Sequence, residues 1–457
     1  MDPEKIGSVY FLGIGGIGMS ALARYFLFRG ATVAGYDRTS SPLTRNLSGE
    51  GIRIHYEEDL RKVPKHPDLV VLTPAIPAEH KELRYFLEQG IPVKKRSEVL
   101  GMICSRYRTI AVAGTHGKTT TSTLVAHMLR SAGVPHIAFL GGISKNYGTN
   151  FLIAEPASGP APVCVAEADE FDRSFLHLSP DIAVITSADA DHLDIYQSHE
   201  QLLGSFAEFT GRVRKGGTLI IKEGTGVKPQ NPDIRILSYS LAGEADYHPE
   251  GIRIAGGQFH FSLVTPQGTE QGFISGMPGS FNVENAVAAS AAGFAAGLRA
   301  DSIREAVRTF TGAERRFDLQ ISRPGLVYID DYAHHPEELR ACITAVRELY
   351  PGKKITGVFQ PHLYSRTRDF ADGFAEALSL LDALILLPVY PARERPICGV
   401  TSKLIYDKVA LERKFMSSKA ELISDLRQCR PEVLLTLGAG DIDQLVQPIV
   451  NAFGQEP

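Results

Sequence analysis

The sequence predicts an α/β protein of three domains, in which helices cover mostly parallel sheets. Short apolar runs alternate with amphipathic segments along most of the 457 residues, which is typical of sheets whose strands are connected by helices. In two places a glycine-rich turn joins such a run to the segment after it, as in nucleotide-binding folds. We place the three domains at residues 1–107, 108–314 and 315–457.

The composition bears on the partners and the compartment that we expect for this protein. The net charge is −4 and no stretch is rich in Lys or Arg, so we expect no nucleic-acid partner. The N-terminal residues lack a signal-peptide pattern and no apolar run is long enough to cross a bilayer, so we expect no membrane association. The five cysteines are scattered without a CxxC pair, which favours a reducing, cytoplasmic compartment.

The first element is a strand at 9–12 that leads into a glycine turn and a helical segment. Gly13, Gly15 and Gly18 fit the pattern G-x-G-x-x-G, and Asp37 ends the next strand about 20 residues further on. Taken alone, this Rossmann-like unit favours a nicotinamide dinucleotide. The N-terminus of the helix, however, requires only that the ligand carry a diphosphate. A turn that lets strand and helix pack closely is the remaining alternative.

The second domain begins with an apolar run at 109–113, followed by the segment Gly114–Thr120 and an amphipathic helix at 121–131. Strand, glycine loop and helix together predict a P-loop ATPase-like α/β domain, although the loop is shorter than the strict pattern G-x-x-x-x-G-K-[ST]. Lys118 can reach the β- and γ-phosphates, and Thr119 can offer a hydroxyl to Mg²⁺. A plain strand-to-helix turn with a surface lysine is the alternative.

Acidic residues and a histidine follow the next strands of this domain. The strand at 163–166 delivers Glu167, which is placed as a Mg²⁺ partner beside a phosphate loop. The strand at 182–186 is followed by His192 among acids, where a ligand and a structural histidine are equally good interpretations. Further on, Asn285 opens an alanine-rich helix, either as a cap or as a reader of an adenine edge.

The third domain repeats the alternation of strand and helix after a linker that contains Arg316. Four successive strands end in polar clusters; these strands are 327–330, 355–359, 384–387 and 433–437. Because parallel strands deliver such clusters to one edge of a sheet, we expect a second Rossmann-like α/β domain with one rim of a site.

Eight motifs, taken together, resemble the Mur ligases of peptidoglycan synthesis over nearly the whole chain. They are Gly13–Ser20, Gly114–Thr120, Ala166–Glu170, Asp191–Asp194, Phe281–Ala286, Arg315–Phe317, Asp330–Pro336 and Gln360–His362. His116, where many relatives carry Asn, indicates the branch of the family that adds L-alanine.

The resemblance implies an ATP-dependent ligase that forms an amide through an acyl phosphate, with ATP and Mg²⁺ bound. It implies UDP-N-acetylmuramate and L-alanine as the other ligands. It also changes the interpretation of the first glycine turn, which in this family accompanies the diphosphate of a UDP-sugar rather than NAD. A monomer or weak homodimer is expected.

The resemblance further implies roles for individual residues. For the UDP-sugar they are Gly13, Gly15, Gly16, Gly18, Met19, Ser20, Asp37, Thr73, Ala75 and Ile76. For ATP they are Gly114, Thr115, His116, Gly117, Lys118, Thr119, Thr120, Asn285, Arg316, Asp331 and His335. The metal ligands are Thr119, Glu167 and His192, and the catalytic residues are Lys118, Glu167, His192 and His335. His362 and Arg366 are expected near the amino acid and the acyl phosphate.

Three alternatives remain at this point. A sister ligase could add another amino acid or recycle a peptide, although the Gln360–His362 stretch speaks against the recycling type. A nicotinamide-linked oxidoreductase is supported only by the first glycine turn and Asp37. A nucleotide-gated binding module without chemistry is the third.

Overall fold

The computed structural model describes residues 1–155, 159–190, 193–392 and 394–454. The chain forms two compact units. The first comprises residues 1–253, 260–276 and 284–311, and the second comprises residues 254–259, 277–283 and 312–457. Within the described ranges, none of the helices combines the length and the apolar character that a membrane crossing requires.

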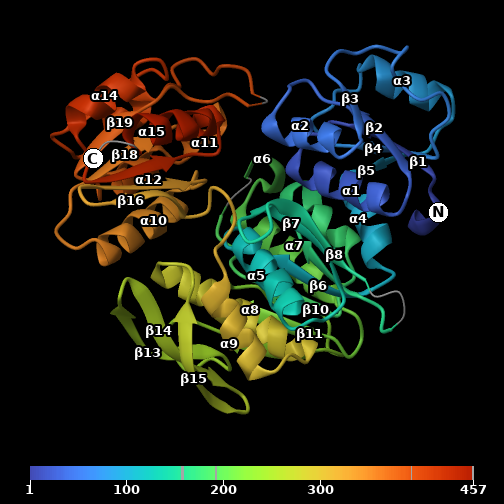
Figure 1. The fold of residues 1–457 in the computed structure, drawn as a ribbon, viewed down its shortest axis with the longest axis horizontal. Helices are drawn as coiled ribbons and strands as arrows, with labels where there is room; N and C mark the ends of the chain where they lie inside the picture. Colours follow the sequence, from blue (N-terminus) through green and yellow to red (C-terminus); the bar gives the residue numbers. More distant parts are fainter. Residues whose placement is uncertain (156–158, 191–192, 393, 455–457) are drawn as a thin grey trace. The chain divides into compact units, whose positions relative to one another are not determined.

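The first sheet of the first unit has the strand order β3-β2-β1-β4-β5, and all of its strands are parallel (Figure 1). Its strands are β1 (Ser8–Leu12), β2 (Thr32–Tyr36), β3 (Arg53–His55), β4 (Leu69–Leu72) and β5 (Val93–Lys95). Its helices are α1 (Ile17–Phe28), α2 (Pro42–Gly49), α3 (Lys81–Glu88) and α4 (Arg96–Cys104). The order reverses between β1 and β4, where doubly wound sheets place ligands.

The second sheet has the order β12-β11-β10-β6-β9-β7-β8 and is parallel except for β8, which runs antiparallel to β7. Its strands are β6 (Arg108–Ala113), β7 (His136–Ser144), β8 (Thr149–Ala154), β9 (Val163–Glu167), β10 (Ile182–Ile185), β11 (Thr218–Lys222) and β12 (Arg235–Tyr239). Its helices are α5 (Lys118–Ser131), α6 (Leu193–Tyr196) and α7 (His199–Gly211). Strand β6, which leads into the predicted phosphate loop at Gly114–Thr120, is therefore central and buried.

A smaller sheet and two helices follow. The sheet has the order β13-β14-β15. Its strands are β13 (His248–Ala255), β14 (Gln258–Thr265) and β15 (Gly268–Ser275), and the helices are α8 (Ser280–Ala296) and α9 (Ala300–Thr309).

The sheet of the second unit has the order β16-β17-β21-β18-β19-β20, parallel except for the β16–β17 pair. Its strands are β16 (Asp318–Arg323), β17 (Leu326–Asp331), β18 (Ile355–Phe359), β19 (Ala383–Leu386), β20 (Lys414–Met416) and β21 (Val433–Leu437). Its helices are α10 (Pro336–Leu349), α11 (Tyr364–Asp369), α12 (Ala371–Leu378), α13 (Lys403–Tyr406), α14 (Leu422–Cys429) and α15 (Val446–Phe453). The predicted α/β class is confirmed.

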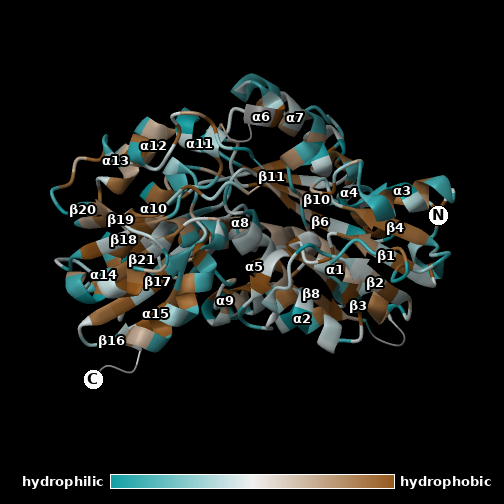
Figure 2. Cartoon of the chain, turned by 90° about the horizontal axis from the view of Figure 1, so that it is seen from above, coloured by the Kyte–Doolittle hydropathy of each residue, from teal (hydrophilic) through white to brown (hydrophobic). Residues whose placement is uncertain are grey.

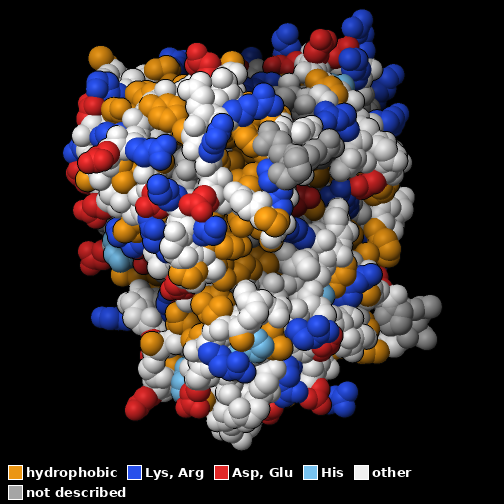
Figure 3. Space-filling view, turned by 60° about the vertical axis from the view of Figure 1, so that its left-hand side comes forward, with side chains coloured by type: hydrophobic (Ala, Val, Ile, Leu, Met, Phe, Trp, Pro, Cys, Tyr) orange, Lys and Arg blue, Asp and Glu red, His pale blue; other side chains and the backbone are white. Residues whose placement is uncertain are grey.

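Hydropathy explains these layers. In Figure 2 the strands are mostly hydrophobic, whereas the helices that cover them carry hydrophilic residues as well. This is the pattern of sheets buried on both faces. Figure 3 shows a face on which Lys and Arg side chains are interspersed with Asp and Glu side chains, so no broad field of one sign covers it.

Helix α1 joins the first two sheets into one unit. Its residues from Met19 to Phe26 are all buried, because the helix packs on β1 and β2 and also on β7 and β8. Tyr25 lies against the rings of Phe139 and Phe151, and the buried Asn150 donates to the carbonyl of Ile17. The expected boundary between residues 107 and 108 therefore falls inside a compact unit, and its position stays a prediction.

His127, on α5, is a buried histidine whose two ring nitrogens both have hydrogen-bond partners. Tyr147 Oη lies 2.6 Å from Nδ1 and Thr309 Oγ1 lies 3.0 Å from Nε2. Because the Thr309 hydroxyl donates to the carbonyl of Glu305, Nε2 must carry the proton and Nδ1 must accept. Burial lowers the pKa of His127 to about 4, so the neutral ring is the folded form.

Stability should therefore depend on the ionisation of His127. Between pH 6.5 and 4 the unfolded chain takes up a proton that the folded chain excludes, so stability falls as the pH falls. From pH 7 to pH 5 we expect the wild type to lose about 2 kcal/mol more than His127→Gln, measured by urea unfolding. The exposed His66→Gln variant is the control and should keep the wild-type slope. Equal slopes for His127→Gln and the wild type would contradict the prediction.

Candidate active site

The first glycine turn connects β1 to α1. Gly13 has φ +87°, and a Cβ there would overlap with the methyl group of Thr73, so only glycine fits. Helix α1 starts at Ile17 after Gly16, which provides no side-chain cap. The first N–H groups of the helix are therefore available to an anion.

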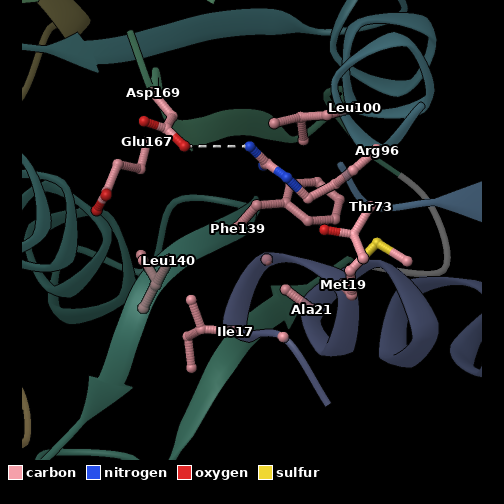
Figure 4. Close-up of a pocket in the computed structure, with 13 residues that line it drawn as sticks. Ile17, Met19, Ala21, Thr73, Arg96, Leu100, Phe139, Leu140, Glu167 and Asp169 are labelled. Atoms are coloured by element: carbon pink, nitrogen blue, oxygen red, sulfur yellow. Dashed lines mark hydrogen bonds and ion pairs between the residues drawn. The ribbon is translucent and has the colours of Figure 1, made fainter. Parts of the chain in front are cut away.

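A cavity of about 230 Å³ opens beside this turn, and Figure 4 shows that elements of both sheet layers of the first unit surround it. The turn and α1 contribute Gly16, Ile17, Gly18, Met19 and Ala21; the loop after β4 adds Thr73 and α4 adds Arg96 and Leu100; β7 adds Phe139, Leu140 and Gly141, and the end of β9 with the loop after it adds Glu167 and Asp169. The structure thus brings the predicted diphosphate turn and the predicted metal carboxylate to one cavity.

Several residues predicted for the UDP-sugar are not among those that line this cavity. They are Gly13, Gly15, Ser20, Asp37, Ala75 and Ile76. Two of them support the turn instead: the Asp37 carboxylate accepts from the Gly15 N–H at 2.7 Å, and the Ser20 hydroxyl donates to the carbonyl of Ile17.

The phosphate loop follows β6 and leads into α5. Gly114 and Gly117 have φ of +135° and +82°, which disfavours any other residue there. A Cβ on Gly117 would lie 2.6 Å from the Asn285 amide oxygen, so Asn285 lies against the loop. Ser187, which was not among the predicted site residues, also contacts the loop: its hydroxyl accepts from the His116 N–H at 2.7 Å and lies 2.9 Å from Thr115 Oγ1.

Lys118, the first residue of α5, is held by a buried carboxylate. Both Glu170 oxygens lie 2.8 Å from its ammonium, and Glu170 is fully buried while Lys118 is 13% exposed. Burial alone would lower the pKa of Lys118, but the carboxylates of Glu170, Asp169 and Glu167 raise it above its usual value. The lysine is therefore a permanent cation, suited to bind phosphate.

Glu167 reaches the cavity because its strand, β9, pairs with β6 in register, with Glu167 opposite Val112. On the other side β7 presents Gly141, where a Cβ would overlap with the Glu167 carboxylate. Thr119 is buried at the start of α5. Oxygen ligands of these types suit Mg²⁺. In the part of the chain that the structure describes, no three His, Cys, Asp or Glu residues form a metal cluster, and the predicted ligand His192 lies outside the described residues.

The remaining predicted residues belong to the second unit. Asp331, at the end of β17, accepts from the N–H groups of Phe317 and Ala333 at 2.6 and 2.7 Å. Burial raises its pKa to about 6. His335 caps α10 through Nδ1, which accepts from the Glu337 N–H.

Arg316, His362 and Arg366 also lie in the second unit. Arg316 lies over the ring of Tyr332. His362 stacks on Tyr390 at 5.7 Å between ring centroids, and Arg366 is buried in α11.

Three family models match the chain in order. They are described as "Mur ligase family, catalytic domain" over residues 8–108, "Mur ligase middle domain" over 112–293, and "Mur ligase, glutamate ligase domain" over 315–442. These ranges follow the three expected domains closely, although they do not fix the boundaries.

Curated relatives match over their full length. The UDP-N-acetylmuramate–L-alanine ligase of Parabacteroides distasonis is 49% identical, with 98% of each chain covered. The enzyme of the same name from Phocaeicola vulgatus is 50% identical, with 100% of each chain covered.

Solved structures are similar as well. The UDP-N-acetylmuramate-alanine ligase of Thermotoga maritima has a TM-score of 0.83 at 27% identity, with 98% of this chain and 99% of that chain covered. A murein peptide ligase of Psychrobacter arcticus has a TM-score of 0.72 at 22% identity, with the same coverage, and shows the fold alone.

Proposed function

This chain belongs to the Mur ligase family, and from that premise we propose that it joins L-alanine to the lactyl carboxylate of UDP-N-acetylmuramate. ATP drives the reaction, and ADP and phosphate are released. The observation that carries the proposal is the full-length identity of about half to relatives that bear this name. The cavity that contains both the first glycine turn and Glu167 supports it.

The chemistry has two steps. The lactyl carboxylate attacks the γ-phosphorus of ATP, so that a carboxyl–phosphate bond forms and the bond to ADP breaks. Lys118 and the loop N–H groups stabilise the charge on the transferred phosphoryl group. The amine of L-alanine then attacks the acyl carbon, phosphate leaves, and the amine proton passes to His192 or to water.

The remaining roles follow from the family. Thr119, Glu167 and His192 would hold Mg²⁺, which when bound would neutralise part of the phosphate charge. Asn285 contacts the phosphate loop and is assigned to the nucleotide, together with Arg316, Asp331 and His335 from the second unit. His362 and Arg366 are assigned to the amino acid and the acyl phosphate. We also propose that the protein is cytoplasmic and a monomer or weak homodimer.

A phosphate-release assay tests the proposal. Release should require UDP-N-acetylmuramate, ATP and L-alanine together, and omission of any one should reduce it to the background rate. Glycine and L-serine, supplied in place of L-alanine, test the choice of amino acid. Release that does not depend on the amino acid would contradict the proposal. A change in NADH absorbance on adding the UDP-sugar would support the nicotinamide alternative instead.

A further inference from the structure

Arg96 is a cavity residue to which the proposed mechanism gives no role. It is the first residue of α4, directly after β5, and its side chain is 20% exposed. Figure 4 shows its guanidinium reaching across the cavity toward Asp169. The sequence feature that could have identified Arg96 is its position after a parallel strand, because such sheets bind ligands at the C-terminal ends of their strands.

The side chain lies directly over the first turn of α1. A Cβ on Gly18 would lie 3.0 Å from Arg96 Cδ and Nη1 and 3.3 Å from Nε. A side chain at position 18 would therefore crowd the guanidinium, which glycine lets lie close to the start of the helix. A planar cation with several donors and a helix N-terminus thus converge on one place.

The opposite end of the guanidinium makes a long ion pair. Its Nη2 lies 3.4 Å from Asp169 Oδ2, and Asp169 is 37% exposed. A pair with this length and exposure is worth little to stability. Arg96 can therefore exchange its ion pair with Asp169 for a better hydrogen-bond acceptor at little cost in stability.

The charges of the cavity also favour Arg96 as a residue that binds an anion. Among the described residues that line the cavity, Glu167 and Asp169 are carboxylates and Arg96 is the one cation. A UDP-sugar brings a diphosphate into this surrounding, and the carboxylates would repel it. Arginine matches phosphate oxygens through parallel hydrogen bonds.

We propose that Arg96 binds the diphosphate of the UDP-sugar, and that Asp169 pairs with its guanidinium only while that ligand is absent. This assignment rests on the proposed function. It adds to the glycine turn a side chain that neutralises the nucleotide diphosphate in the same cavity as Glu167, the proposed metal ligand.

Calorimetric binding of UDP-N-acetylmuramate, without ATP or metal, tests the assignment. Arg96→Gln should weaken binding roughly 10- to 100-fold, the range of a charge-assisted hydrogen bond, and Arg96→Lys should lie between it and the wild type. Lys95→Gln is the matched control, because Lys95 is adjacent, forms a 2.9 Å pair with Asp172 and is 53% exposed. It should bind within about twofold of the wild type.

Asp169→Asn separates ligand binding from a structural role. If Asp169 competes with the diphosphate, this variant should bind as tightly as the wild type or a few-fold more tightly. If the pair merely holds the cavity together, Asp169→Asn should weaken binding as much as Arg96→Gln, and that result would overturn the assignment. Binding by Arg96→Gln that equals binding by Lys95→Gln would overturn it too.

UDP-N-acetylglucosamine, which lacks the lactyl carboxylate, identifies the group that Arg96 contacts. The loss on Arg96→Gln should be the same for both UDP-sugars; a loss confined to UDP-N-acetylmuramate would overturn the diphosphate assignment. ATP binding by Arg96→Gln and Arg96→Lys shows that these variants are folded. A wild type that binds neither UDP-sugar would contradict the proposed function itself, whereas binding by the wild type with no loss in the variants would contradict only the role of Arg96.

Discussion

Lys118→Met is expected to reduce turnover by at least ~10³-fold while leaving the affinity for UDP-N-acetylmuramate nearly unchanged. We propose that the ammonium stabilises the charge on the transferred phosphoryl group, and catalysis of this kind is mostly electrostatic. The first glycine turn, where we propose that the UDP-sugar binds, lies in contrast between β1 and α1. Phosphate release at saturating substrates and calorimetric binding of the UDP-sugar measure the two quantities.

The same change should also destabilise the protein, because the methionine leaves the Glu170 carboxylate buried without the ammonium that faces it. Removing one member of a buried pair typically costs about 3–5 kcal/mol. Lys118→Met with Glu170→Gln should restore most of this stability but none of the turnover. A double variant that regained turnover would show that Lys118 serves folding rather than chemistry.

Gly141→Ala should nearly abolish activity with little effect on folding. The new methyl group meets the end of a flexible side chain, the Glu167 carboxylate, which can move away at small cost. The displaced carboxylate then leaves the place from which we propose that it holds Mg²⁺. Because a metal contact contributes several kcal/mol to such a reaction, we expect a loss of roughly 10²- to 10³-fold in kcat and a higher Mg²⁺ requirement.

Two further variants serve as controls for this prediction. Gly204→Ala places the same methyl group in open space and should leave activity unchanged. Gly141→Ala combined with Glu167→Gln should be no less active than Glu167→Gln alone, because both changes remove the same contact. Additive losses would show that Gly141 acts through another residue.

The local sequence predicted the elements that carry the chemistry. The strand expected at 109–113 is β6, and the glycines and Lys118 that follow it adopt the loop-to-helix connection that was predicted. Alternating apolar runs also predicted the parallel strands β1, β9, β10 and β17. These features depend on backbone preferences and hydrophobic periodicity, which are properties of short segments.

Two strands at the edges of the sheets were not predicted. Strand β8 and the antiparallel strand β16 lie at sheet edges, where half-buried residues give a weak pattern. The pairing of Lys118 with Glu170 was also missed, because a sequence shows that a lysine and an acid are present but not that one is folded against the other.

The sequence by itself therefore determined the α/β class, the two glycine turns and the family, because these depend on residues that are neighbours in the chain. Only the tertiary structure decided that α1 is buried between two sheets, that Gly141 makes room for Glu167, and that Arg96 lies over Gly18. Each of these contacts joins segments that are far apart in the sequence. The packing of α1 against β7 and β8, and of α1 against α4, brings these segments together.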